Sequence, residues 1–83
     1  MYYVYVLRLI NNDLYIGYTA DLRKRLKYHQ DGKSKFTKPH RPIKLLYYEA
    51  YLSKDDASKR EYNLKTGQQR ELLKNRINNS INL

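Results

Sequence analysis

The residue types with the clearest chemical potential are tyrosines near the N-terminus and an arginine–histidine pair further along the chain. Tyr3 and Tyr5 are two positions apart, so in a strand their side chains share one face, and Tyr15 follows ten residues after Tyr5. Arg25 and His29 are four positions apart, so on a helix they project from the same side. Phenol, guanidinium and imidazole groups are the types that bind anions and transfer protons, and this spacing lets them meet.

Each of these residues also has an ordinary structural interpretation. Because the chain has ten tyrosines and no tryptophan, tyrosine must supply most of its aromatic core. Arg25 lies in the basic run 23–27, which is typical of a solvated helix face. His29 suits the last turn of a helix, where the helix dipole favours it. A later carboxylate, Glu61, is spaced to form an ion pair with Lys65 one helical turn away.

Secondary structure must position these side chains, and the sequence predicts its elements. Asn11 to Asp13 form a turn between two segments rich in β-branched and aromatic residues, which gives a hairpin. Strands are predicted at 2–9, 14–19 and 43–50, and helices at 22–30, from 55 or 56 through 64, and at 68–78. Thr19 or Asp21 could cap the first helix, Asp55 or Asp56 the second, and Leu72, Leu73 and Ile77 of the third are expected to face inward. The order ββαβαα predicts an α+β fold with a three-stranded, mostly antiparallel sheet flanked by helices.

Length and composition limit the class of protein. A chain of 83 residues is expected to form one small domain over residues 1–83, with a single modest core. The absence of cysteine excludes disulfides, zinc–thiolate sites and thiol catalysis. No apolar run reaches the length of a signal peptide or a membrane span, so a cytoplasmic location without membrane contact is predicted.

The charge balance points to a polyanionic partner. The chain has 17 Lys and Arg against 8 Asp and Glu, a formal net charge of +9 and a pI near 9.8. Such an excess attracts nucleic acid and speeds its encounter with the protein. A lysine-rich, low-GC proteome would produce a similar excess, so the charge by itself is weak evidence.

Two tripeptides and several later positions follow one another in a set order. They are Tyr3-Val4-Tyr5, Tyr15-Ile16-Gly17, Thr19, Asp21-Leu22, Arg25-Leu26, His29 and, in the pattern Ala57-x-x-x-Glu61-x-x-x-Lys65, Glu61. This set resembles the signature of the GIY-YIG nuclease family over residues 2–77, although Tyr3 stands where the first motif usually begins with glycine. The chain is most similar to the small single-domain, UPF0213-like branch, kin to excision-repair and homing endonucleases.

The resemblance implies a metal-dependent endonuclease or other DNA-processing protein that hydrolyses phosphodiester bonds. It places one Mg²⁺ or Mn²⁺ on Glu61, and it places Arg25 on the phosphate oxygens. Tyr5 becomes the candidate general base, provided that neighbouring cations lower its pKa from about 10. Tyr15 and His29 would orient the water or the phosphate, with His29 a second candidate for proton transfer.

Basic residues of the first predicted helix and of the loop that follows it extend this hypothesis to substrate binding. Phosphate contacts are expected from Arg23, Lys33, Lys35, Lys38, His40 and Arg41, in preference to the alternative of a loop that is merely solvated. The alternative function is a nucleic-acid-binding module that keeps the fold with little or no cleavage. Family nucleases commonly gain DNA affinity from an appended module or a partner protein, so a protein partner is also expected.

Overall fold

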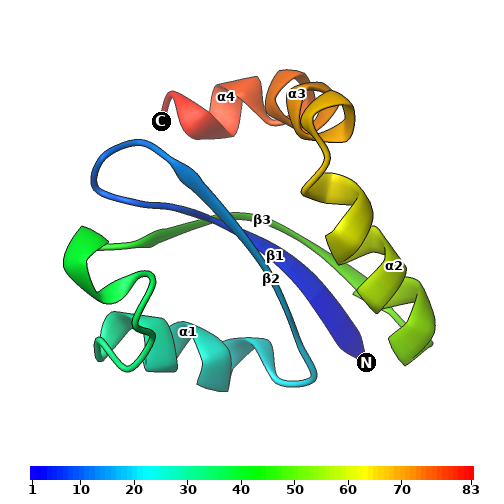
Figure 1. Ribbon diagram of the computed structural model, residues 1–83, viewed down its shortest axis with the longest axis horizontal. Helices are drawn as coiled ribbons and strands as arrows, with labels where there is room; N and C mark the ends of the chain where they lie inside the picture. Colours follow the sequence, from blue (N-terminus) through cyan, green and yellow to red (C-terminus); the bar gives the residue numbers. More distant parts are fainter.

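The computed structural model, which describes residues 1–83, contains one three-stranded sheet with helices on both faces (Figure 1). The strands are β1 (Tyr2–Arg8), β2 (Leu14–Thr19) and β3 (Lys44–Tyr51), all antiparallel, in the order β2-β1-β3. The helices are α1 (Leu22–Gln30), a 3-10 turn at Lys38–His40, α2 (Lys54–Leu64), α3 (Gly67–Arg76) and α4 (Asn78–Ile81). The predicted α+β fold is confirmed, with one further short helix at the C-terminal end.

The predicted hairpin forms between β1 and β2, and its register decides which tyrosines meet. The turn uses Asn12 at a φ of 70°, a left-handed conformation that asparagine tolerates, and the Leu9 N–H donates to the Asp13 carbonyl. In the resulting register Tyr5 lies opposite Gly17. Tyr3 and Tyr5 therefore share the sheet face that carries Gly17, while alternate residues of β1 point to the other face.

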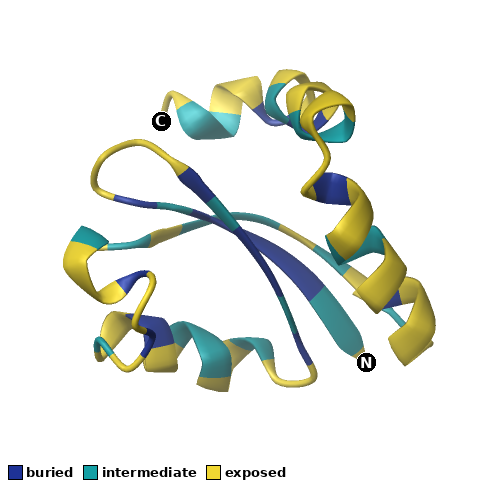
Figure 2. Cartoon of the chain, in the orientation of Figure 1, coloured by how far each residue is buried: buried dark blue, intermediate teal, exposed yellow.

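The hydrophobic core lies between the sheet and the helices α2 and α3. Figure 2 shows the buried residues on the strands and on the inward sides of these helices. The core cluster consists of Val4, Val6, Leu14, Ile16, Ala57, Leu64, Leu73 and Ile77. Burial of a large aliphatic side chain contributes about 1.5–3 kcal/mol, so this layer supplies most of the driving force for folding.

The prediction that Leu72 faces inward was wrong, because this side chain is 55% exposed while Leu73 is buried. Neighbouring residues of a helix point about 100° apart, so only one of the two can face the sheet. The last predicted helix also does not run unbroken to residue 78. It ends at Arg76, and α4 begins after Ile77, whose φ of −106° and ψ of 21° depart from helical values.

Helix caps set the ends of α1 and α2. Asp21, and not Thr19, caps α1 by accepting a hydrogen bond from the Lys24 N–H. The cap of α2 is Ser53, so α2 begins before the predicted start. The two aspartates expected to cap it lie in its first turn instead, where carboxylates interact favourably with the helix dipole. None of the helices combines the length and the apolar character needed to cross a membrane.

Candidate active site

The centre of the site is a buried chain of three polar side chains between β1, α1 and the loop after α1. The Tyr5 hydroxyl lies 2.8 Å from His29 Nε2, and His29 Nδ1 lies 2.8 Å from Thr37 Oγ1. All three residues are 2% exposed or less. Two proton arrangements satisfy these contacts; in one, Tyr5 O–H donates to Nε2 and Nδ1–H donates to Thr37. In both arrangements the imidazole is neutral, and the side-chain polar atoms of Tyr5, His29 and Thr37 are all paired.

Gly17 provides the space that the Tyr5 ring occupies. A Cβ atom built on Gly17 would lie 2.4 Å from Cζ and from the hydroxyl oxygen of Tyr5. The two residues face each other across the β1–β2 ladder, so the ring lies directly over the glycine. The absence of a Cβ at Gly17 thus admits a close approach, and the group that approaches is the side chain of Tyr5.

Tyr15 connects this buried chain to the surface. Its ring centroid lies 5.2 Å from that of His29, 6.3 Å from that of Tyr5 and 5.6 Å from that of Phe36. Phe36, in the loop after α1, is 66% exposed. The sequence therefore placed Tyr5, Tyr15 and His29 correctly as neighbours.

Arg25 lies at the edge of the same cluster. Its guanidinium carbon is 4.9 Å from the ring centroid of Tyr28, a cation–π arrangement. Arg25 and Tyr28 line an open pocket of about 320 Å³ together with Thr19, Asp21 and Lys24. The guanidinium is thus held beside the buried chain and at an opening where an anion could approach.

Electrostatics keep the buried chain neutral. Burial raises the pKa of the Tyr5 hydroxyl, Tyr15 and Glu61 add to this increase, and Arg25 opposes it. Burial also lowers the pKa of His29, and Arg25 acts in the same direction. The expected effect of a cation on Tyr5 is present, but burial outweighs it, so the phenol holds its proton at neutral pH.

Glu61 brings a carboxylate to this region from α2. Its side chain is 25% exposed, and its negative charge is among the causes that raise the pKa of Tyr5. The predicted ion pair with Lys65 also forms, with Oε2 3.4 Å from Nζ, but the lysine is 54% exposed and such pairs contribute at most about 1 kcal/mol. Glu61 therefore forms the ordinary ion pair with Lys65 and also acts through its charge on Tyr5.

The donor set fits one hard divalent cation rather than a preformed metal cage. No group of three or more histidine or carboxylate side chains could hold a metal ion. Glu61 offers a single, partly exposed carboxylate, and Mg²⁺ commonly binds through one or two carboxylates while it retains water and phosphate ligands. Glu61 is the residue that would hold such an ion.

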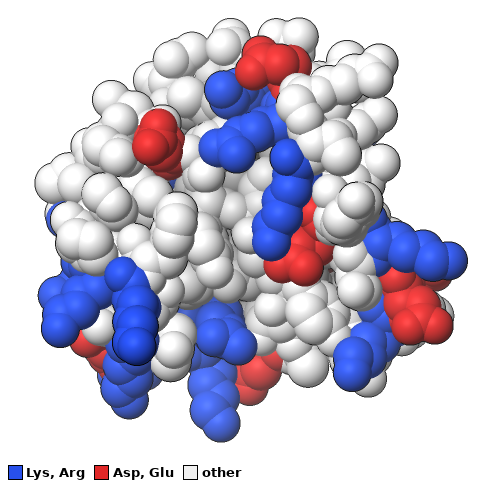
Figure 3. All heavy atoms as spheres, in the orientation of Figure 1, with Lys and Arg blue, Asp and Glu red and all other residues white.

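Basic side chains surround the site on the α1 side of the sheet. Eight of the 17 Lys and Arg residues lie between Arg23 and Arg41, a stretch with one acidic residue, Asp31. Figure 3 shows Lys and Arg side chains gathered along its lower edge, the position of α1 and the following loop in Figure 1. Of the predicted phosphate contacts, Arg23, Lys33, Lys35, Lys38 and Arg41 are exposed or partly exposed and His40 is half-buried.

Arg41 and His40 also organise the loop itself. Arg41 donates from Nη1 to the Gln30 carbonyl and from Nε to the Lys38 carbonyl, and its guanidinium lies over Gly32. The His40 carbonyl accepts a hydrogen bond from the Ile10 N–H, which ties the loop to the hairpin. These two residues hold the loop in place, whereas the lysines project from it.

Sequence reasoning missed three contributors to the site. Thr37 had no detectable signal, because a threonine in a basic loop indicates nothing until His29 is seen to reach it. Phe36 was similarly hidden. Tyr28 could have been found, since its position three residues after Arg25 is a helical contact spacing.

A strand–strand hairpin with paired tyrosines, an arginine–histidine helix and a carboxylate on a later helix together define a GIY-YIG type of domain. A family model described as "GIY-YIG catalytic domain" matches residues 1–78. This chain belongs to the GIY-YIG catalytic domain family.

Relatives place the chain near the UPF0213 proteins. It is 42% identical to a UPF0213 protein of Staphylococcus haemolyticus over 88% of this chain and 90% of the relative. It is 46% identical to a UPF0213 protein of Bacillus pumilus over 78% of this chain and 67% of the relative. The solution NMR structure of a UPF0213 protein from Bacillus halodurans is similar, with a TM-score of 0.57 and 36% identity, over 88% of this chain and 82% of that one.

Proposed function

We propose that this chain is a divalent-metal-dependent endonuclease that hydrolyses phosphodiester bonds in nucleic acid, with DNA as its substrate. The single observation that carries the proposal is the buried Tyr5–His29 hydrogen bond, 2.8 Å long, next to an arginine and a carboxylate whose charges act on Tyr5. Binding of nucleic acid does not by itself require a paired phenol and imidazole on which an arginine and a carboxylate act.

The hydrogen-bonded pair explains how a phenol with a raised pKa can still act as a base. Tyr5 accepts a proton from the attacking water while its own proton moves to His29 Nε2, so a free phenolate never accumulates. Burial and Arg25 disfavour the imidazolium, so it is a transient species, and it donates from Nδ1 to Thr37 Oγ1, which holds the ring in place. In this step His29 receives the proton from Tyr5 and does not contact the phosphate.

Charged groups at the opening complete the proposed site. Arg25 can fork onto the phosphate oxygens as negative charge develops on them. Glu61 would hold a Mg²⁺ or Mn²⁺ ion, which when bound supplies positive charge to the phosphate and its leaving oxygen. Tyr15, between His29 and the surface, orients the attacking water or the phosphate.

A second function, nucleic-acid binding without cleavage, is favoured by one specific observation. Glu61 is already paired with Lys65, and the exposed lysines after α1 can hold a phosphate backbone without any chemistry. A partner protein that supplies DNA affinity fits either function. The two functions differ in whether a metal-dependent product appears.

The test is cleavage of end-labelled and supercoiled DNA with Mg²⁺, Mn²⁺ or a chelator. We expect nicking that the chelator abolishes and that is lost in Glu61→Gln and in Arg25→Ala, with both variants folded by circular dichroism. Glu71→Gln, which breaks an exposed ion pair with Lys74 on α3, is the matched control and should cleave normally. Binding with a steep salt dependence but no product would replace the nuclease with the binding module.

A further inference from the structure

A second polar cluster lies on the opposite face of the sheet, centred on Glu49 of β3. Arg60 of α2 forks onto this carboxylate, with Nε 2.8 Å from Oε1 and Nη2 3.0 Å from Oε2. The Tyr47 hydroxyl donates to Oε2 at 2.5 Å, and the Tyr51 hydroxyl donates to Oε1. The fifth member is Asn63, whose side-chain oxygen accepts from Arg60 Nη1. Glu49 thus has two partners on each oxygen.

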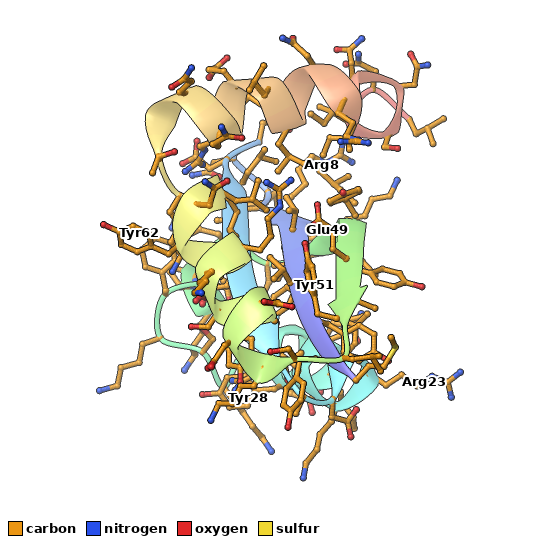
Figure 4. All side chains as sticks on the ribbon, turned by 90° about the vertical axis from the view of Figure 1, so that its right-hand side faces the viewer. Arg8, Arg23, Tyr28, Glu49, Tyr51 and Tyr62 are labelled. Carbon is orange, nitrogen blue, oxygen red and sulfur yellow. The ribbon has the colours of Figure 1, made fainter.

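The cluster is largely closed to solvent and strongly bound. The side chains of Glu49 and Arg60 are 16% and 26% exposed. The hydrogen bonds from Arg60, Tyr47 and Tyr51 outweigh the effect of burial and lower the pKa of Glu49 to about 2. In Figure 4, Glu49 and Tyr51 are labelled on β3 and its C-terminal end, close to α2, whereas Tyr62 on α2 projects away from the sheet.

Arg60 immediately precedes Glu61 on α2, so helical geometry fixes the angle between the directions in which the two side chains point. Ala57 and Leu64 are fully buried and mark the stripe of α2 that faces the sheet. Successive residues turn by about 100°, so Arg60 and Glu61 flank this stripe on opposite sides. Because Arg60 is directed to β3 at one edge of the sheet, Glu61 is directed toward the β2 edge, and its charge is one of the causes that raise the pKa of Tyr5.

We propose that Glu49 and Arg60 are positioning residues that set the rotation of α2 about its axis and thereby direct the Glu61 carboxylate toward the β2 edge of the sheet. The apolar stripe is a weak rotational constraint, since of its two fully buried residues only Leu64 has a large side chain and Ala57 has a single methyl group. A bidentate guanidinium–carboxylate pair is directional and fixes the arginine in a plane. An effect of this pair on catalysis rests on the proposed nuclease function. Its effect on the position of Glu61 does not.

The first experiment does not depend on nuclease activity. Crystal structures of the wild type, Glu49→Gln and Arg60→Lys compare the separation between the Glu61 carboxylate and the Tyr5 hydroxyl. Arg60→Lys keeps the charge but loses the planar fork, so we expect α2 to turn and this separation to change in both variants. An unchanged position of Glu61 in folded Glu49→Gln and Arg60→Lys would overturn the proposal, whether or not the wild type cleaves DNA.

The second experiment measures cleavage kinetics, once the wild type and Glu61→Gln have established the nuclease. We expect kcat to fall about 10- to 100-fold in Glu49→Gln and Arg60→Lys while KM for DNA stays within about twofold, because the substrate-binding residues lie elsewhere. The Mn²⁺ concentration needed for half-maximal rate should rise as well. Ile77→Val, which loosens the same core layer, is the matched control for lost stability and should keep the wild-type kcat.

Two kinetic results would count against the positioning role. A wild-type kcat in Arg60→Lys would show that the charge alone suffices and the fork has no directional effect. A loss of kcat in Ile77→Val equal to that in Glu49→Gln would show that any destabilisation of this layer has the same effect. If the wild type itself fails to cleave, the nuclease proposal fails, and the crystal structures alone decide the positioning proposal.

Discussion

The two faces of the sheet carry polar clusters of opposite design. On the α2 face, Glu49 and Arg60 are charged, and each charge is met within the cluster. On the α1 face, the buried chain of Tyr5, His29 and Thr37 is neutral, and the nearest charged groups lie at its edge. In the first cluster both oxygens of Glu49 are occupied by its partners, whereas at the edge of the second Arg25 borders an open pocket and Glu61 pairs only with a half-exposed lysine.

This difference shows how polar groups of the same types can serve structure or chemistry within one small fold. A buried charge is stable only when it is paired and hydrogen-bonded, which Glu49 achieves with donors from its own strand and from α2. The neutral hydrogen-bonded cluster of Tyr5, His29 and Thr37 needs no counter-charge, so it is stable without a bound ligand. Substitutions in the two clusters should accordingly have different effects, and the largest is expected at Tyr5.

Tyr5→Phe should produce the largest effect on activity, together with a stability loss of about 1–3 kcal/mol because it leaves the buried His29 Nε2 without a partner. The ring still fills the space over Gly17, but the hydroxyl that exchanges protons with His29 is lost. We expect cleavage to slow by about 100- to 10,000-fold, the range for loss of a general base, as measured by single-turnover kinetics. Retention of the wild-type rate would remove Tyr5 from the mechanism.

Gly17→Ala should disturb the same cluster through its packing. The added methyl group would lie 2.4 Å from the Tyr5 ring, so the ring must move and its hydrogen bond to His29 must lengthen. Overpacking of this kind costs about 1–3 kcal/mol, measurable by urea unfolding, and cleavage should decline as well. Gly67→Ala is the control, because a Cβ there meets no atom within 4 Å. Equal stability losses in the two variants would contradict the close approach.

The contribution of Glu49 to stability should disappear in acid. Its pKa is lowered from an ordinary value of 4.5 to about 2. Its stabilising effect is therefore complete above pH 5 and is lost as the pH falls from 4.5 through about 2. The difference in free energy of unfolding between the wild type and Glu49→Gln should shrink by about 2 kcal/mol between pH 5 and pH 2. Urea titrations at each pH measure it, and a difference that does not vary with pH would refute the paired carboxylate. Any pH dependence that His29 adds to the free energy of unfolding is the same in the wild type and in Glu49→Gln, so it cancels in the difference.

The smallest effects are expected from the exposed lysines of the loop after α1. Lys33→Gln and Lys35→Gln remove surface charges, so DNA affinity should fall modestly at every sequence. The slope of log K against log salt should flatten by roughly one unit for each phosphate that the variant no longer neutralises. Fluorescence anisotropy over a salt series measures this slope. Lys54→Gln at the start of α2 is the control, and an identical change there would mean that only net charge matters.

Local sequence was sufficient to predict the order of the elements up to α3 and to indicate that Tyr5, Tyr15 and His29 could meet. The Asn–Asp turn, the spacing of Arg25 and His29 and the YIG segment at 15–17 each depend on residues close in the chain. The family resemblance then added Glu61, which no local spacing could distinguish from an ordinary ion-pair partner of Lys65. Helix ends were less predictable, since a serine cap at Ser53 competes with two nearby aspartates.

The pairing of the polar groups, by contrast, depends on the folded chain as a whole. The hydrogen bond between Tyr5 and His29 joins residues 24 positions apart, and the fork between Glu49 and Arg60 joins a strand to a helix. Both require a particular strand register and a particular rotation of a helix over the sheet, which are set by the packing of the entire core. The direction of the Tyr5 pKa has the same origin, because burial, a property of the folded chain, outweighs the neighbouring arginine.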